Sequence, residues 1–168
     1  MARTELERTV QQSILDRLTD FSPRDSRDPA MSRDESEREY RISVQRDLEW
    51  ILNTRRTIVR IGPEHREVRN SVHEYGITDT TGVAIATPAG RNAMVEEIRD
   101  AIARFEPRLS NVRVKLSDVD QVKSPQVRFV IQATLRMDPS PEQVVFDTVL
   151  EVASGTYAVE DSAAGGAN

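Results

Sequence analysis

The tripeptide Glu106-Pro107-Arg108 brings an acid and a base close together around a conformationally fixed residue. Pro107 would end the helix before it and fix the backbone, so that Glu106 and Arg108 stand at a rigid corner. A guanidinium pairs bidentately with a carboxylate, whether that carboxylate belongs to the same chain or to another protein. Two interpretations follow: an intramolecular clamp between a helix and a sheet, or a contact surface for a partner.

Carboxylates could also serve a glycosidase, which requires two of them across a sugar and one kept protonated by apolar surroundings. An ion pair with Arg108 would keep Glu106 ionised, which is the wrong state for a general acid. The other acids of this region, Glu96, Glu97 and Asp100, fall on the solvated face of a predicted helix. We therefore expect no enzymatic activity and no catalytic residues.

Metal and nucleophile chemistry is also poorly supported. His65 and His73 lie eight residues apart, which places them two helical turns apart, too far to share one metal ion without a third ligand between them. Asp118 and Asp120 lack the glycine and the third acid of a calcium loop. Ser71 lies close to His73 but not in a nucleophile elbow. We expect neither a metal nor a cofactor.

Composition limits the class of partner and the compartment. The 168 residues suffice for one domain with tails, and the net charge of −5 comes from interspersed acids and bases. Without a basic stripe, nucleic acid is not an expected partner. The absence of cysteine suits a reducing compartment, and no apolar run approaches the ~20 residues of a membrane span. We expect a cytoplasmic protein without direct membrane contact.

Helical periodicity dominates the first two thirds of the chain. Residues 1–20 predict an N-terminal amphipathic helix, and residues 21–39, with two prolines and mixed charges, predict a charged flexible linker. The N-terminal helix would either bind a partner or fold back on its own domain, which we place at residues 40–160. Further helices are predicted over residues 36–53, 64–74 and 91–105, with a short extended segment at 57–61.

The helix over residues 36–53 has an apolar stripe formed by Tyr40, Val44, Leu48, Ile51 and Leu52. Trp50, the only tryptophan, lies at the flank of this stripe. A tryptophan there is typical of a core or groove anchor, but an exposed one would be a candidate hot spot for binding.

After Pro107 the apolar period changes from 3.6 to 2. Alternation is found over residues 112–116, 128–136 and 144–152, and Gly155 precedes a fourth short run at 156–159. These runs predict a C-terminal antiparallel sheet of three to four strands. The expected fold class is α+β, with N-terminal helices packed on that sheet and a disordered tail at residues 161–168.

Four segments in order resemble the TssE family of type VI secretion baseplate proteins, relatives of the small wedge protein of contractile phage tails. They are Ser13-Ile-Leu-Asp-Arg-Leu18, Asp47-Leu-Glu-Trp-Ile-Leu-Asn-Thr-Arg55, Ser71-Val-His-Glu-Tyr-Gly-Ile-Thr-Asp79 and Phe105-Glu-Pro-Arg-Leu109. The resemblance spans residues 13–159. His73 departs from the leucine expected at that position, which affects local packing.

The resemblance implies a structural wedge component that joins the larger wedge subunits, of the TssF and TssG type, and the baseplate adaptor. Its partner-binding residues would be Glu106, Pro107 and Arg108. It would also offer a sheet edge to sheath subunits of the TssB and TssC type, and so start sheath polymerisation. Residues 144–152 and 156–159 are the candidate edge strands. The alternatives are a phage-tail-type wedge protein or, less in keeping with the residues, a lysozyme-like peptidoglycan hydrolase.

Overall fold

A computed structural model describes residues 10–19, 23–24, 31–59, 61–79, 87–120, 126–138 and 140–162. The chain divides into two compact units, residues 1–44 and residues 45–168. The boundary falls inside helix α2 (Arg33–Asn53), a few residues beyond the predicted domain start at residue 40.

In the first unit, residues 10–19 fold back on the first turns of α2. The backbone N–H of Val10 donates to Ser36 Oγ at 3.0 Å, and the Gln12 side chain donates to the Ser36 carbonyl at 3.0 Å. Helix α1 (Ile14–Leu18) begins only after Ser13, whose hydroxyl caps it. The helix predicted over residues 1–20 is therefore wrong for residues 10–13, because Val10 is bonded to Ser36 instead; residues 1–9 lie outside the described part.

Helix α2 includes the last seven residues, 33–39, of the predicted linker. Ser32 and Glu35 form a reciprocal capping box: the Ser32 N–H donates to Glu35 Oε2 at 2.8 Å, and the Glu35 N–H donates to Ser32 Oγ at 3.3 Å. An ion pair between Arg33 and Glu37 supports the first turns. The linker prediction for residues 21–39 is thus wrong from Arg33 onward, and much of its earlier part lies outside the described residues.

The apolar stripe of α2 is confirmed, since all five of its predicted members are buried. Trp50, in contrast, is 49% exposed, so the core position that its type favoured is wrong and the alternative of an exposed tryptophan holds. It sits beside the stripe, on the side of the helix that carries Arg46.

Between α2 and the next long helix, the predicted elements shorten. No strand forms among the described residues of 57–61, and the helix predicted over 64–74 is reduced to α3 (Arg66–Arg69) and the 3-10 turn η1 (Val72–Glu74). Ser71 separates the two, because its hydroxyl donates to the Val68 carbonyl at 2.7 Å and accepts from the His73 N–H at 3.3 Å.

Gly76 lets this segment cross close to the end of α2. Its φ is +96°, and a Cβ there would lie 2.3 Å from the Thr54 carbonyl oxygen. Ile77 donates to the same carbonyl at 3.0 Å, and its own carbonyl accepts from the Arg56 N–H at 2.8 Å. The crossing fixes where Arg56 and Thr78 lie.

Helix α4 (Pro88–Phe105) begins three residues earlier than predicted and ends where predicted. Thr87 caps it by accepting from the Gly90 N–H at 3.0 Å. Pro88 occupies the first turn, where a backbone N–H would have no partner within the helix, so the missing N–H of proline costs no hydrogen bond. Its buried side chains are Met94, Ile98, Ala101 and Ile102.

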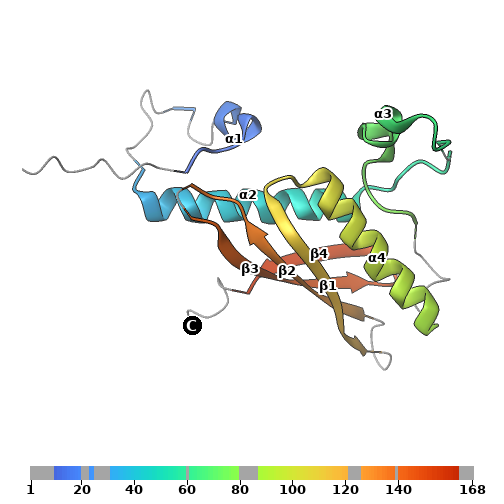
Figure 1. Ribbon diagram of the computed structural model, residues 1–168. Coiled ribbons are helices and arrows are strands. Elements are labelled where there is room, and N and C mark those ends of the chain that lie inside the picture. The colour runs from blue at the N-terminus through green and yellow to red at the C-terminus, as the bar shows by residue number, and fades with distance from the viewer. Residues whose placement is uncertain are drawn as a thin grey trace, which may run out of the picture. The chain divides into compact units, whose positions relative to one another are not determined.

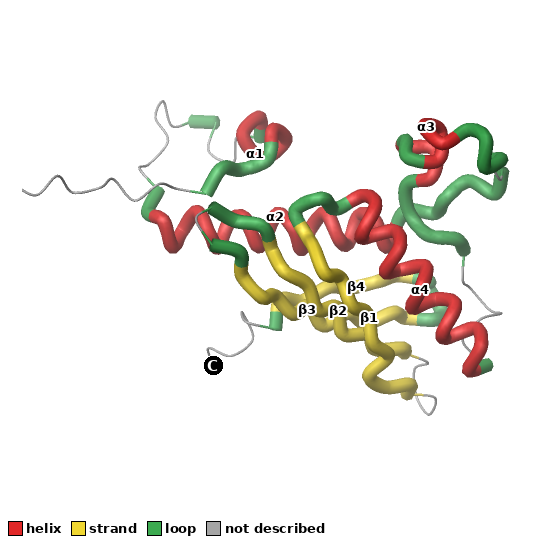
Figure 2. The backbone as a smooth tube through the Cα atoms, in the orientation of Figure 1, coloured by secondary structure: helices red, strands yellow, loops and turns green. Residues whose placement is uncertain are grey.

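The C-terminal sheet is an antiparallel meander with the strand order β1-β2-β3-β4. Its strands are β1 (Leu109–Asp120), β2 (Gln126–Leu135), β3 (Glu142–Glu151) and β4 (Thr156–Asp161). Figures 1 and 2 show α4 leading into β1 and the four strands side by side. The predicted α+β fold, with helices before an antiparallel sheet, is confirmed. Asp161 belongs to β4, so the prediction of a disordered tail is wrong for this residue; residues 163–168 lie outside the described part.

One face of the sheet is buried and supplies most of the core, which α4 helps to cover through its packing against β1. Buried and less buried residues alternate along β2, β3 and β4, as a half-covered sheet requires. Within the described ranges, no helix combines the length and the apolar character that crossing a membrane requires.

Candidate functional site

The corner between α4 and β1 contains the predicted partner-binding residues Glu106, Pro107 and Arg108. Helix α4 is closed by a hydrogen bond from the Glu106 N–H to the Ile102 carbonyl at 2.9 Å, and the turn by one from the Leu109 N–H to the Glu106 carbonyl at 3.1 Å. Pro107 is exposed, whereas Glu106 is only 2% exposed. The corner therefore shows its proline and hides its carboxylate.

Arg108 clamps this corner to α2. Its Nε donates to Glu106 Oε1 at 2.7 Å, and its backbone N–H donates to the same oxygen at 3.2 Å. Its Nη2 lies 2.5 Å both from Glu106 Oε2 and from Asp47 Oδ2 on α2. Sequence reasoning left open an intramolecular clamp or a partner contact; the structure shows the clamp, and it adds Asp47, which no local pattern indicated.

The charges at the corner shift the pKa values of two neighbours. Burial lowers the pKa of Arg108, but the hydrogen bonds and charges of Glu106 and Asp47 outweigh it, so the net pKa is raised and the guanidinium stays charged. Burial, with the negative charges of Asp47 and Glu106, raises the pKa of Tyr75. Its ring packs edge-on against Phe105 with the centroids 5.2 Å apart. The buried Glu106 thus faces a permanent cation and a neutral phenol.

Trp50 extends the corner along the exposed side of α2. The guanidinium of Arg46 lies 4.8 Å from the centre of the Trp50 ring, and its Nη2 donates to Asp47 Oδ1 at 2.8 Å. Arg108 donates to the other oxygen of Asp47, so Asp47 links Arg46 and Trp50 to the corner in one continuous surface. We call the exposed parts of Arg46, Trp50, Pro107 and Arg108 the corner surface.

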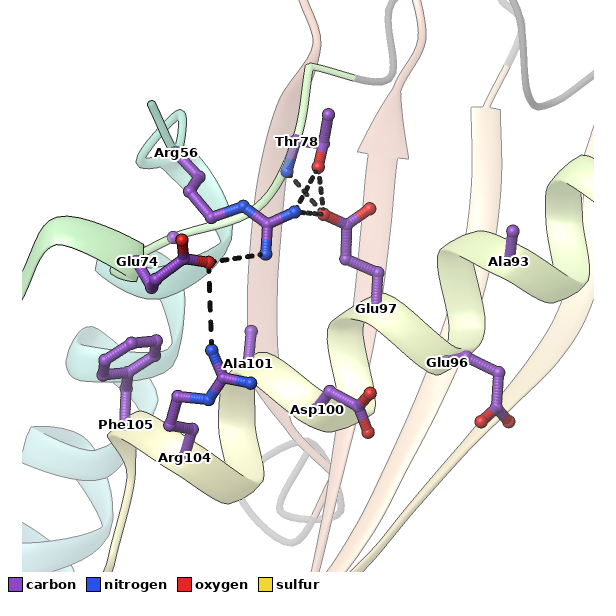
Figure 3. Close-up of a pocket in the computed structure, with 11 residues that line it drawn as sticks. Arg56, Glu74, Thr78, Ala93, Glu96, Glu97, Asp100, Ala101, Arg104 and Phe105 are labelled. Atoms are coloured by element: carbon purple, nitrogen blue, oxygen red, sulfur yellow. Dashed lines mark hydrogen bonds and ion pairs between the residues drawn. The ribbon is translucent and has the colours of Figure 1, made fainter. Parts of the chain in front are cut away.

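A second charged region lies between α4 and the crossing at Gly76. It is an open hollow of about 430 Å³. Figure 3 shows Arg56 between Glu74 and Glu97, at 3.3 and 3.4 Å, and Arg104 within 4.0 Å of Glu74. Glu97 also accepts from the N–H and the hydroxyl of Thr78.

The same hollow tests the glycosidase alternative. Glu96 and Asp100, the remaining acids that line it, are both paired with Arg99 on the exposed side of α4. Every carboxylate that lines the hollow therefore has an arginine partner. The hollow therefore does not offer the apolar surroundings that keep the general acid of a glycosidase protonated.

The two histidines do not converge on a site. His65 is exposed beside Glu64, and His73 lies partly buried beside Glu74 at 3.8 Å. Among the residues that the structure describes, no group of three or more potential ligands is placed to hold a metal ion.

The two edges of the sheet differ. The candidate edge strand 144–152 is wrong, because β3 pairs with β2 on one side and β4 on the other. The second candidate, β4, is an edge, but side chains of α2 bond to its outer backbone groups. The Tyr157 N–H donates to Asn53 Oδ1 at 2.9 Å and the Val159 N–H to Glu49 Oε1 at 3.0 Å.

Strand β1, which the sequence did not single out, forms the opposite edge. Over residues 109–117, its hydrogen bonds run to β2 or to the preceding turn. Two register shifts interrupt its pairing with β2, one after Ser110 and one after Leu116, and Asn111 adopts a φ of +54°. The alternating basic residues Arg113 and Lys115 were the available signal, since charged side chains are common on edge strands.

A family model described as baseplate wedge protein gp25 matches residues 38–140, which is more than half of the chain. A search of curated protein sequences gives no significant match. The matched range includes most of α2, the corner and the first two strands. The charged side chains of the corner bind one another, which agrees with a structural role. The chain belongs to the gp25 family of baseplate wedge proteins.

Proposed function

We propose that this protein is the small wedge component of a type VI secretion baseplate and that it starts polymerisation of the contractile sheath, without catalysing a reaction. It works in the cytoplasm, bound to the larger TssF- and TssG-type wedge subunits and the adaptor, and offers a strand-accepting edge to TssB- and TssC-type sheath subunits. The family match supports the baseplate role, and the four motifs of the sequence support the secretion system.

The observation that carries the sheath role is the open edge at β1. This strand has 12 residues, and the outer backbone groups of residues 109–117 have no partner from another element. An extended segment from another protein can pair with such an edge through main-chain hydrogen bonds, while its alternate side chains set the register. The opposite edge, at β4, lacks this opportunity because α2 occupies it.

The side chains of β1 favour an acidic segment. Lys115 and Arg113 are both exposed, whereas Val114 between them is buried against the core. A strand with carboxylates opposite these two cations would gain from each pair, and a basic strand would be repelled. The same cations discourage pairing with an unrelated edge.

A charge reversal at each end of one cross-strand row tests this role. Lys115, Val130, Asp147 and Glu160 are aligned across the four strands, so that Lys115 lies at the β1 edge and Glu160 at the β4 edge. We expect Lys115→Glu to abolish sheath assembly, followed as fluorescent sheath tubes in cells, and Glu160→Lys to leave it normal. Both variants should still co-purify with the larger wedge subunits. Normal tubes with Lys115→Glu would contradict the role of β1.

We also propose that the wedge contact of Glu106, Pro107 and Arg108 is made through the corner surface. Glu106 is buried and bonded to Arg108. A partner can therefore reach the proline ring, the outer part of Arg108 and Trp50. An exposed tryptophan beside a fixed arginine is the composition of a binding hot spot. Glu106 then acts through Arg108, as a positioning residue.

Two exposed prolines supply the test. We expect Pro107→Glu to prevent co-purification with the larger wedge subunits. The negative charges of Glu106 and Asp47 would repel the new carboxylate, and its side chain would stand in the way of a partner at the corner surface. Pro141→Glu, at an exposed proline just before β3, is the matched control and should bind normally. Equal binding by both variants, at unchanged melting temperature, would remove the corner from the interface.

The genomic neighbourhood separates the secretion system from a phage-tail-type machine. Adjacent genes for sheath and wedge subunits together with an adaptor support the first, and tail-fibre and capsid genes support the second. A turbidity assay on peptidoglycan tests the hydrolase alternative; activity that is lost in Glu106→Gln would overturn the non-catalytic assignment.

A further inference from the structure

The outer edge of β4 is bonded by a ladder of side chains rather than by a strand. Gln45 donates to the Val159 carbonyl at 2.7 Å, and Asn53 donates to the Tyr157 carbonyl at 2.9 Å. Glu49 also accepts from the Val159 N–H and Asn53 from the Tyr157 N–H, so the backbone donor and acceptor of both Tyr157 and Val159 are satisfied. Just past the end of α2, Arg55 donates to the Gly155 carbonyl, so the ladder continues into the turn.

The geometry of a helix and a strand explains why the ladder fits. Gln45, Glu49 and Asn53 recur every four residues, a rise of about 6 Å along a helix. Outward-facing groups of a strand recur every two residues, about 6.8 Å apart. The two repeats nearly coincide over this short distance, so one face of α2 follows Val159 and then Tyr157 as the strand runs in the opposite direction.

We propose that Gln45, Glu49 and Asn53 form an edge guard: they cover an edge of β4 that would otherwise pair with the β4 edge of a second copy of this protein. The guard leaves β1 as the strand-accepting edge. The inference rests on the proposed function, in which the sheet accepts strands at one edge only. Its test involves no sheath protein.

A second copy is the occupant that the strand itself favours. β4 contains no proline and no lysine, and its pairing with β3 has no register shift, so it lacks three of the features that protect natural edges. In a two-fold antiparallel pair, Tyr157 of one copy would face Val159 of the other, and Ala158 would face itself. Glu160 would then lie opposite Thr156, so no like charges would meet.

The decisive variant is Glu49→Ala/Asn53→Ala, which removes three of the four ladder bonds to Tyr157 and Val159. We expect amide hydrogen exchange at Tyr157 and Val159 to accelerate by about fivefold to tenfold, the factor for one lost hydrogen bond, in dilute protein. Ala158, whose backbone groups face β3, should not change. Sedimentation at rising concentration should show a dimer for this variant and a monomer for the unmodified chain.

A cysteine reporter identifies the surface that pairs. The chain contains no cysteine, so Ala158→Cys introduces a single thiol on an exposed position of β4. In the two-fold pair the two Cα atoms would lie about 4.5 Å apart, which is within disulfide reach. We expect a disulfide-linked dimer when the guard is removed and monomer when it is intact.

Glu49→Gln is the matched control, because the amide keeps the Oε1 acceptor for the Val159 N–H and should keep the protein monomeric. If the double variant does not fold, Glu49→Ala alone decides, with exchange at Val159 and the same thiol reporter. A guard-free variant that stays monomeric with unchanged exchange overturns the proposal, as does equal disulfide formation with the guard intact. The Lys115→Glu experiment stands apart from these outcomes and tests only the sheath role.

Discussion

The two arginine clusters of the second unit contain the same chemical groups but differ in burial. At the corner, Arg108 has a side chain that is 15% exposed, and it holds a carboxylate, that of Glu106, that is 3% exposed. In the hollow beside α4, the side chains of Arg56 and Glu97 are 32% and 23% exposed. The first cluster lies where water cannot replace a lost partner, and the second lies where water can.

Burial decides what each cluster does for the fold. A buried ion pair has little net effect compared with apolar packing, yet removing one partner leaves a desolvated charge that strongly destabilises the fold. A partly exposed pair contributes less and is screened by salt. We therefore regard the corner as a fixed structural joint and the hollow as an adjustable contact between α4 and the crossing at Gly76.

The largest expected effect is that of Arg108→Ala. It would leave the buried carboxylate of Glu106 without its cation, and we expect a loss of about 3–5 kcal/mol in the free energy of unfolding, measured with urea. The double variant Glu106→Gln/Arg108→Met should recover part of this loss, since it removes both charges. A double variant as unstable as Arg108→Ala would show that packing, not the unpaired charge, dominates the corner.

A smaller effect is expected for Glu97→Ala in the hollow. The change removes the acceptor for the Thr78 N–H, the Thr78 hydroxyl and Arg56, and should lower the free energy of unfolding by about 1–2 kcal/mol. Glu96→Ala is the neighbouring control: its carboxylate points into solvent beside Arg99, and its removal should not change the melting temperature measurably. Equal losses for the two variants would contradict the role assigned to the hollow.

Tyr75 makes the free energy of unfolding depend on pH, because its pKa responds to burial and to the negative charges of the corner. Its pKa is raised above the ordinary 10.0 by burial first and by Asp47 and Glu106 second. The folded state therefore keeps the phenol proton where the unfolded chain loses it, so this contribution is complete below about pH 10 and is lost as pH rises through the folded pKa. We expect the unfolding free energy of the unmodified chain to fall relative to that of Tyr75→Phe above pH 10. Parallel curves for the two proteins would contradict this coupling.

The smallest expected effect separates the two clusters by salt. Raising the ionic strength from about 0.1 to about 1 M shortens the screening length from roughly 10 to 3 Å. The destabilisation by Glu97→Ala should shrink in high salt, whereas that by Arg108→Ala should persist. If both losses shrink alike, water reaches the corner as freely as the hollow.

Local sequence patterns predicted the main elements well. The stripe from Tyr40 to Leu52, the end of α4 before Pro107 and the period-2 runs were all confirmed, because each depends on residues within one or two turns of one another. The start of α2 was placed too late, although its signal, Ser32 with Glu35 three residues on, is readable in the sequence. Ser71 split a predicted helix by bonding to backbone on both of its sides, a competition that periodicity does not register.

The candidate site was predicted only in part. Glu106 and Arg108 were named from the sequence, and their pairing was one of two open interpretations; Asp47, 61 residues away, completes the clamp and has no local signal. For Trp50 the residue type favoured a core or groove position, with an exposed position as the alternative; its exposure follows from a helix whose inner face is already filled by Leu48, Ile51 and Leu52.

By itself, the sequence determined which segments are helical or extended and where proline ends a helix, since these outcomes follow from side-chain period and backbone sterics. It also carried the motifs of the wedge family. Only the tertiary structure decided which edge of the sheet stays open. Gln45 and Glu49 resemble any solvated polar residues on a helix, and they become backbone partners because folding brings them to Val159, more than a hundred residues away.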